Sequence, residues 1–292
     1  MLHLSAPVTP LVFAGALLVP VCPVLSPTGL AAQQDREPGW YDQAEVSLVL
    51  TAGNSESSTF GVENRLERLF PRSKLTFDAG GIRVETRTTE RSAIGTPDDF
   101  VIVEQSASRP TTENYFAALR YDRSLSDRSY TYASGGWVRN RFAGIDDRWT
   151  GAAGIGWNVI ETDRTSFQAD IAGTATSEQP VVGEADSFAG LRLSWDFGHR
   201  LTETTKLTSL LVVDENLSDT EDLRAEFDNS AAVDISGTLA LKTGVKLLFD
   251  NLPALQEVAL RPAPGEPSSG AVLVPLDELD TQVTVALIIT VD

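Results

Sequence analysis

Residues 115–139 read YFAALRYDRSLSDRSYTYASGGWVR and contain a pattern that repeats along most of the chain. The odd positions of 115–121 hold tyrosine, alanine, leucine and tyrosine, whereas Arg120 and Asp122 occupy even positions. A period of two is typical of a β-strand with one apolar and one polar face, and it differs from the 3.6-residue period of a helix. Residues 124–128, of which all but Leu125 are polar, then interrupt the alternation before it resumes. The stretch therefore predicts two antiparallel strands joined by a short turn.

The same unit recurs on both sides of this stretch. We expect about twelve strands, an even number as in bacterial single-chain barrels, over residues 44–51, 57–70, 74–84, 115–122, 130–139, 149–159, 167–171, 191–197, 207–213, 225–235, 239–249 and 283–291. In the fifth of these we place Tyr130, Tyr132 and Val138 on the apolar face and Arg139 on the polar face. The two glycines at 80–81 predict a bulge that shifts the phase of the third strand.

The connections between these strands differ in length. Every second connection is short, near Pro71, Ser126, Thr162, Thr202 and Gly237, whereas the long ones, residues 88–112, 176–186 and 251–276, all fall at the other end. Short periplasmic turns and longer outer loops are typical of outer-membrane barrels. The connections at 53–57, 142–146 and 216–222 are also short or modest, so the rule holds in one direction only.

Aromatic residues gather near both predicted strand ends. Trp40, Trp157 and Trp195 fall near the periplasmic ends, and Tyr115 and Trp149 fall near the outer ends. Aromatic girdles at both interfaces are typical of lipid-facing barrels. The sequence therefore predicts an all-β fold, an antiparallel transmembrane β-barrel, with a secreted or periplasmic soluble β-sandwich or barrel that binds a ligand as the alternative.

The N-terminal segment predicts export. Residues 1–32 contain no Lys, Arg, Asp or Glu, and the apolar run 11–21 is too short to span a bilayer as a helix. The small residues Gly29 and Ala31 suit a signal peptidase. We expect residues 1–32 to be a signal peptide and residues 33–292 to form the barrel domain in the bacterial outer membrane.

Composition excludes several kinds of site from the exported part. After Cys22 the chain has no cysteine, and its one histidine is His199, so disulfides and Cys/His zinc sites are excluded there. The net charge of −18 argues against nucleic acid as a partner. His199 lies in a predicted periplasmic turn and no Gly-x-Ser-x-Gly motif occurs, so we expect no catalytic activity and no cofactor.

The polar faces predict a charged lumen. The candidates for lining it carry both signs: Glu45, Glu63, Arg65, Glu67, Lys74, Asp78, Arg120, Asp122, Arg139, Asp170, Arg192, Asp196, Lys242 and Lys246. They either pair with one another and fill a narrow interior, or line a small aqueous path that selects solutes. We therefore expect a small pore or a non-conducting envelope-stress barrel.

The predicted outer loops are acidic. Their carboxylates are Asp98, Asp99 and Glu104, then Glu178, Glu184 and Asp186, and then Asp214, Glu215, Asp219, Glu221 and Asp222. Hard divalent cations prefer such oxygen ligands, but no fixed ligand spacing of the EF-hand kind is present. We expect solvated loop charge, with divalent cations as a further partner beside outer-membrane lipid, lipopolysaccharide and the barrel-assembly machinery.

Two tracts carry a resemblance to a known family. Residues 53–55, GNS, and residues 140–148, NRFAGIDDR, with the glycines that follow, resemble the salt-induced outer-membrane proteins, a domain family of unknown function. The positions that carry it are Gly53, Asn54, Arg141, Phe142, Gly144, Gly154 and Gly156. The resemblance implies an outer-membrane β-barrel. It implies no substrate and no catalytic residue.

Overall fold

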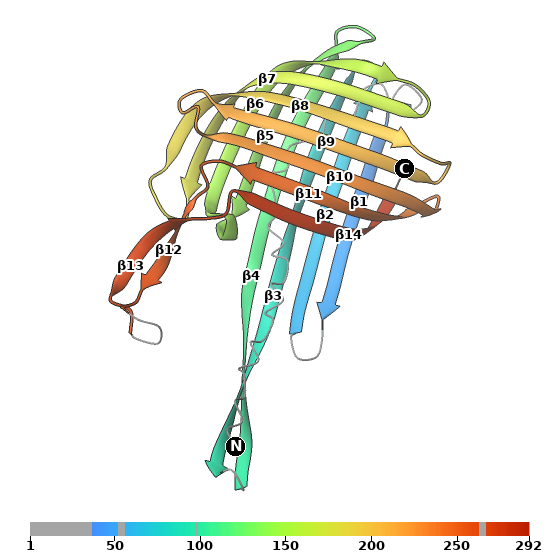
Figure 1. Ribbon diagram of the computed structural model, residues 1–292. Helices are drawn as coiled ribbons and strands as arrows, with labels where there is room; N and C mark the ends of the chain where they lie inside the picture. Colours follow the sequence, from blue (N-terminus) through green and yellow to red (C-terminus); the bar gives the residue numbers. More distant parts are fainter. Residues whose placement is uncertain (1–36, 52–55, 97–98, 263–266, 292) are drawn as a thin grey trace, which may run out of the picture.

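The chain folds into a closed antiparallel barrel of twelve strands, shown by a computed structural model that describes residues 37–51, 56–96, 99–262 and 267–291 (Figure 1). The barrel strands are β1 (Trp40–Thr51), β2 (Glu56–Phe70), β3 (Ser73–Thr96), β4 (Asp99–Ser124), β5 (Ser129–Asn140), β6 (Ile145–Glu161), β7 (Thr165–Pro180), β8 (Asp186–Arg200), β9 (Thr205–Asn216), β10 (Leu223–Ser236), β11 (Leu239–Asp250) and β14 (Leu279–Val291). The predicted all-β barrel is confirmed. The predicted signal peptide, Gly53, Asn54 and Asp98 lie outside the described residues.

Each barrel strand pairs with its neighbour in the chain, except that β11 pairs with β14 and β14 closes the barrel against β1. The short connections all lie at one end, which we call the short-turn end: residues 71–72, 125–128, 162–164, 201–204 and 237–238. β1 begins and β14 ends there as well, because Asp42 pairs with Val291. The opposite end, which we call the loop end, carries the long excursions.

Two predicted loops are strands instead. The polar stretch 88–112 continues β3 and β4 as one ladder up to the pair Thr96–Asp99, so it forms a long hairpin that leaves the barrel (Figure 1). Its threonines, valines and isoleucines suit a strand, and its turn-forming residues are concentrated in GTPDD at 95–99. The stretch 251–276 contains a second hairpin, β12 (Leu255–Leu260) and β13 (Gly270–Pro275).

The bulge predicted at the two glycines of β3 is not there. Gly80 and Gly81 keep the register with both neighbouring strands, and the shift occurs between Val84 and Glu85. The glycines have a packing role instead. A Cβ atom on Gly80 would lie 2.8 Å from the Phe116 ring, so glycine is needed for that ring to pass over the strand.

The two faces of the wall have opposite chemistry. Outer side chains are apolar and exposed, such as Leu119, Ile155 and Leu193, whereas inner side chains such as Lys74 and Asp78 are polar and buried. A soluble barrel has the reverse arrangement, with an apolar interior. The only helix in the described part of the chain is a three-residue 3-10 turn, and no helix there is long and apolar enough to cross a membrane.

Strand β5 has the opposite orientation to the predicted one. Tyr130, Tyr132 and Val138 are buried on the inner face, and Trp137 and Arg139 lie on the outer face. Both faces of this strand carry an aromatic residue, so alternation alone leaves the phase open. The tyrosines belong inside because their hydroxyl groups find polar partners there.

Candidate functional site: the barrel lumen

The lumen is crossed by ion pairs between strands that are not neighbours in the sheet. Arg120 on β4 contacts Asp170 on β7, with a distance of 3.3 Å between guanidinium nitrogen and carboxylate oxygen. The Lys242 ammonium on β11 lies 3.0 Å from both Glu45 oxygens on β1. Such contacts can only run through the interior. The charged inner residues therefore fill the lumen by pairing with each other.

The deepest of these groups, the Arg120 cluster, consists of Arg120, Asp122, Asp170, Tyr130 and Tyr132. The Arg120 Nε atom lies 2.8 Å from Asp122 Oδ1, and its guanidinium carbon is 3.7 Å from the centre of the Tyr132 ring. The Tyr130 hydroxyl donates a hydrogen bond to Asp170. The three charged side chains expose 4%, 3% and 0% of their surface. Water is therefore excluded from this cluster, which lies near the short-turn end.

A glycine makes room for the Arg120 cluster. Gly156 on β6 faces the lumen between Tyr130 and Asp170, and a Cβ atom there would overlap both side chains. Gly154, two residues earlier, faces Ala172 in the same tight manner. These two family-motif glycines are therefore explained by the close approach of lumen side chains to the wall.

A second buried group extends the cluster toward β2 and β3. Arg65 Nε lies 2.7 Å from Asp78 Oδ1, and the Asp78 side chain is 2% exposed. Lys74, with 1% exposure, lies 4.0 Å from Glu67. Together with the Arg120 cluster, these pairs occupy the short-turn half of the lumen with side chains of both signs.

The loop-end half of the lumen is different, because it contains a cavity of about 430 Å³, which we call the vestibule. Glu178 joins two arginines there: its Oε2 atom lies 2.7 Å from Arg148 and 2.9 Å from Arg224. Arg224 also donates two hydrogen bonds to Asp222, at 2.9 and 3.1 Å. The Arg224 side chain is 22% exposed. These ion pairs line a space that water can enter.

Apolar groups and further ion pairs complete the vestibule wall. Phe142 and Leu276 line one side of it. Arg192 forms a two-point pair with Asp214, at 2.7 and 2.8 Å. Asp280, on the inner face of β14, pairs with Leu248 through the backbone ladder, and its residue lines the cavity. The vestibule is thus a mixed polar and apolar pocket with more carboxylates than arginines.

The structure places all but one of the predicted lumen residues on the inner face. These are Glu45, Glu63, Arg65, Glu67, Lys74, Asp78, Arg120, Asp122, Asp170, Arg192, Asp196, Lys242 and Lys246. The exception is Arg139, which lies on the outer face, 3.1 Å from Asp146, with 42% of its side chain exposed. Its misplacement follows from the inverted phase of β5.

Sequence reasoning missed several lumen groups. Tyr130 and Tyr132 were expected outside, and Glu178, Asp214 and Asp222 were expected as solvated loop charges. A correct estimate of strand length would have predicted the lumen position of Glu178 and Asp214. Strands β7 and β9 continue past the predicted strand ends, so these two carboxylates belong to strands and not to loops. The described residues hold no group of three or more His, Cys, Asp or Glu that could bind a metal ion.

The residues of the second family tract form a cap at the loop end. Arg141–Ala143 make the 3-10 turn, and the Asn140 side chain accepts a hydrogen bond from the Ala143 backbone at 3.1 Å. Gly144 closes the turn with a φ of 77°, which favours glycine. Phe142 lines the vestibule. The tract therefore shapes the mouth of the lumen.

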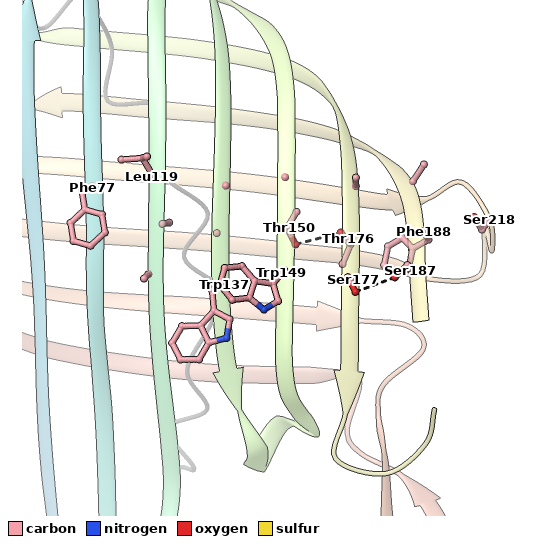
Figure 2. A pocket seen from close by; sticks show the side chains of 17 residues that line it. Phe77, Leu119, Trp137, Trp149, Thr150, Thr176, Ser177, Ser187, Phe188 and Ser218 are labelled. Carbon is pink, nitrogen blue, oxygen red and sulfur yellow. Dashed lines mark hydrogen bonds between the residues drawn. The ribbon is translucent and has the colours of Figure 1, made fainter. Parts of the chain in front are cut away.

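The outer face has a hollow of its own, of about 880 Å³, across β3 to β8. Figure 2 shows Phe77 and Leu119 on one side of it and Ser187 and Phe188 on the other, with Trp137 and Trp149 between them. The hollow exists because the strands between carry small outward residues. A Cβ atom on Gly135, for example, would meet nothing within 4 Å.

Comparison with known proteins gives a family and a general likeness. The model of the family described as "Protein of unknown function, DUF481" matches residues 44–257. No curated protein matches the sequence.

Solved structures resemble the barrel at low identity. The NanC porin has a TM-score of 0.44 and 5% identity, over 87% of this chain and 100% of that one. The translocator domain of the autotransporter NalP from Neisseria meningitidis has a TM-score of 0.41 and 11% identity, over 88% and 90%. The CymD monoaromatic hydrocarbon channel has a TM-score of 0.38 and 7% identity, over 89% and 90%. At these scores none of the three lends its activity to this chain.

Proposed function

The chain belongs to the DUF481 family of unknown function, and we propose its function from the geometry of the barrel, because the family description names no activity. We propose that the protein is a bacterial outer-membrane barrel whose lumen is closed at the short-turn end. It is a non-catalytic envelope barrel with an outward-facing vestibule and no permanently open pore. The signal peptide expected at residues 1–32 would export it, and the short-turn end would face the periplasm.

The membrane location is supported by the outer face. Val245 and Val283 on neighbouring strands expose 43% and 57% of their surface, and Leu193 on the other wall exposes 50%. Soluble monomers rarely expose such continuous apolar surface. Lipid removes the cost of that exposure, and the ladders between neighbouring strands satisfy most of the backbone hydrogen bonds that membrane-embedded strands require. The soluble binding-protein alternative would leave the same face in water.

The closed lumen is supported by one observation above all, the burial of Arg120 between Asp122 and Asp170. An aqueous path would hydrate these charges and leave them exposed. Instead their side chains are almost wholly inaccessible, and the aromatic rings of Tyr130 and Tyr132 pack beside them. Pairing compensates the charges for their lost hydration, and the same pairing blocks the passage of ions.

The resemblance to salt-induced proteins adds an expectation about expression, not about geometry. Induction by salt, and a protective role in the stressed envelope, fit a barrel that spans the membrane without a standing leak. The matched family description names no inducing condition, so this part rests on the resemblance alone.

Planar-bilayer recording of the refolded wild-type protein tests the proposal. We expect no steady conductance. The Arg120→Ala/Tyr132→Ala double variant, which removes the guanidinium and the ring beneath it, should show measurable conductance. The matched control is Arg139→Ala/Tyr115→Ala, which removes the same two side-chain types from the outer face and should stay silent. A steady ohmic current through the wild type would overturn the closed lumen.

A further inference from the structure

The barrel is closed by an unusually short ladder between its first and last strands. β1 and β14 share five residue pairs, from Asp42–Val291 to Val46–Leu287, whereas β1 shares twelve pairs with β2 and β14 shares eleven with β11. Within the described residues, the β1–β14 pairing ends at Val46–Leu287. The edge of β1 that faces β14 is therefore unpaired over Ser47–Thr51, and the edge of β14 that faces β1 is unpaired over Leu279–Ala286. In Figure 1, β1 and β2 extend toward the bottom of the view, while β14 and β11 run across it. The wall therefore has a seam at the loop end.

The seam leaves two sheet edges with unpaired backbone groups. Edge strands at the depth of the hydrocarbon region are not tolerated unless they are paired or buried, because lipid offers no hydrogen bonds. Val283 and Val285, beside the seam, expose 57% and 54% of their surface to the outside. Exposed edges of this kind bind an added strand through main-chain hydrogen bonds, with adjacent side chains adding contact area.

The hairpin of β12 and β13 forms a separate two-stranded sheet that pairs with no strand of the barrel among the described residues. It has six residue pairs, and all twelve of its residues are exposed. Many of them are apolar, with Leu260 at 48% and Leu273 at 55% exposure. A lone two-stranded hairpin is marginally stable at best in water. Figure 1 shows the hairpin standing clear of the barrel wall.

From these two features we propose that the seam is a docking site for the chain's own β12–β13 hairpin, which completes the wall as two additional strands. The connection from β13 to β14 has three residues, 276–278, which is a usual length for a hairpin loop. Folding at that loop lays β13 antiparallel against β14 and β12 antiparallel against β1. Every neighbour in the resulting fourteen-stranded wall then runs antiparallel, and the strand number stays even.

The lengths and the reach of the chain allow this movement. The free edge of β14 has eight residues and β13 has six, while the free edge of β1 has five residues and β12 has six. From Asp250 to Leu255 the chain can extend roughly 17 Å. Crossing over β14 and β13 to the place of β12 needs three strand spacings, roughly 14 Å. The movement gives up the backbone hydrogen bond from Leu276 to Ala254 and gains two ladders.

The docked register gives a direct test by disulfide formation. A three-residue loop places Leu273 opposite Thr281, with the Cα separation of an antiparallel pair, which suits a disulfide. Cys22 is the sequence's only cysteine, so a Cys22→Ser background is free of other thiols. The full chain with Leu273→Cys and Thr281→Cys is refolded into vesicles, oxidised, and examined by mass spectrometry of linked peptides.

Two controls define the outcomes. Leu273→Cys with Glu257→Cys links partners within the hairpin and shows that the hairpin forms. Leu273→Cys with Val233→Cys, on the outer face of β10, reports a hairpin that merely swings freely. We expect the link to Thr281→Cys to form faster than the link to Val233→Cys by about tenfold or more, because docking holds the first two thiols within bonding distance.

The same samples distinguish docking from its competitors. The linked protein should also unfold at a higher temperature than its reduced form, because the link then joins edges that are already paired. Equal rates of formation for the two disulfides would overturn the proposal. Disulfides between separate chains would also overturn it, and would indicate that a second copy of the chain fills the seam. The proposal does not depend on the closed lumen, so wild-type conductance would leave it standing.

Discussion

Two arginine–carboxylate clusters occupy the same lumen at different depths, and they differ in how much water reaches them. At the short-turn end, Arg120 is 4% exposed and its partner Asp170 is fully buried. In the vestibule, Arg224 is 22% exposed and its partner Glu178 is 12% exposed. The chemistry of the groups is the same. Depth decides whether they close the barrel or line a pocket, because an ion pair is coupled more strongly where water does not screen it.

The largest effect should come from breaking the buried cluster. Replacing Arg120 with alanine leaves Asp122 and Asp170 as uncompensated buried charges, which should lower the free energy of unfolding in vesicles by about 3–5 kcal/mol. The Arg120→Ala/Asp170→Asn double variant should lose less than the sum of the two single changes, because the second change removes one of the two carboxylate charges that the first leaves uncompensated. Additive losses measured by urea titration would mean that the two residues do not interact.

A charge on the outer face should have the next largest effect. Leu193→Arg places a cation among apolar side chains that face lipid, which should cost about 2–4 kcal/mol if the residue lies near the midplane. Leu217→Arg, on an equally exposed leucine in the connection after β9, should have little effect. Heat-modifiable mobility of the folded proteins checks both. Equal tolerance of the two changes would contradict the assignment of the outer face to lipid.

Two glycines compare the packing of the lumen with that of the outer face: Gly156 faces the lumen, and Gly135 faces the outer hollow. Gly156→Ala inserts a methyl group against Tyr130 and Asp170 and should destabilise the barrel by about 1–3 kcal/mol, as overpacking does. Gly135→Ala adds the same group in the outer hollow, where it meets nothing within 4 Å. That change should be neutral or slightly stabilising in the same urea titration. If both changes are harmless, the Arg120 cluster is looser than the structure shows.

The smallest effect should come from the vestibule. Arg192→Ala breaks a pair with Asp214, whose side chain is 30% exposed. Water can solvate the carboxylate that remains, so the loss of unfolding free energy should be about 1 kcal/mol. A loss as large as that of Arg120→Ala would show that the vestibule is as dry as the short-turn half, and the contrast between the clusters would disappear.

The alternation of residue types predicted most of the fold. Alternate residues of each strand face the outside and the lumen, so apolar and charged residues alternate along the sequence. Leu119 and Arg120 show this on β4. Alternation failed on β5, where Tyr132 and Trp137 put aromatic rings on both faces and only tertiary contacts fix the phase. It also missed the strands within 88–112. The polar residues of this stretch are typical of a loop, but β3 and β4 pair through it up to Thr96–Asp99.

The candidate site was predicted less completely than the fold. The charged inner residues could be named from their strand phase, but their partners could not, because Arg120 meets Asp170 across two intervening strands. Strand phase gives a face and does not give a height or a partner across the lumen. The role of Gly156 was hidden for the same reason, since it depends on how Tyr130 and Asp170 approach the wall.

Thiol accessibility at two depths of the lumen tests the central claim most directly. In the Cys22→Ser background, Ser194→Cys places a thiol beside Asp170, where Ser194 now lies 3.4 Å from the carboxylate and is 7% exposed. Asp280→Cys places one in the vestibule. With a charged, membrane-impermeant thiol reagent on both sides of the vesicle, we predict fast reaction at position 280 and almost none at position 194. Equal reaction rates at the two positions would contradict a lumen closed at its short-turn end.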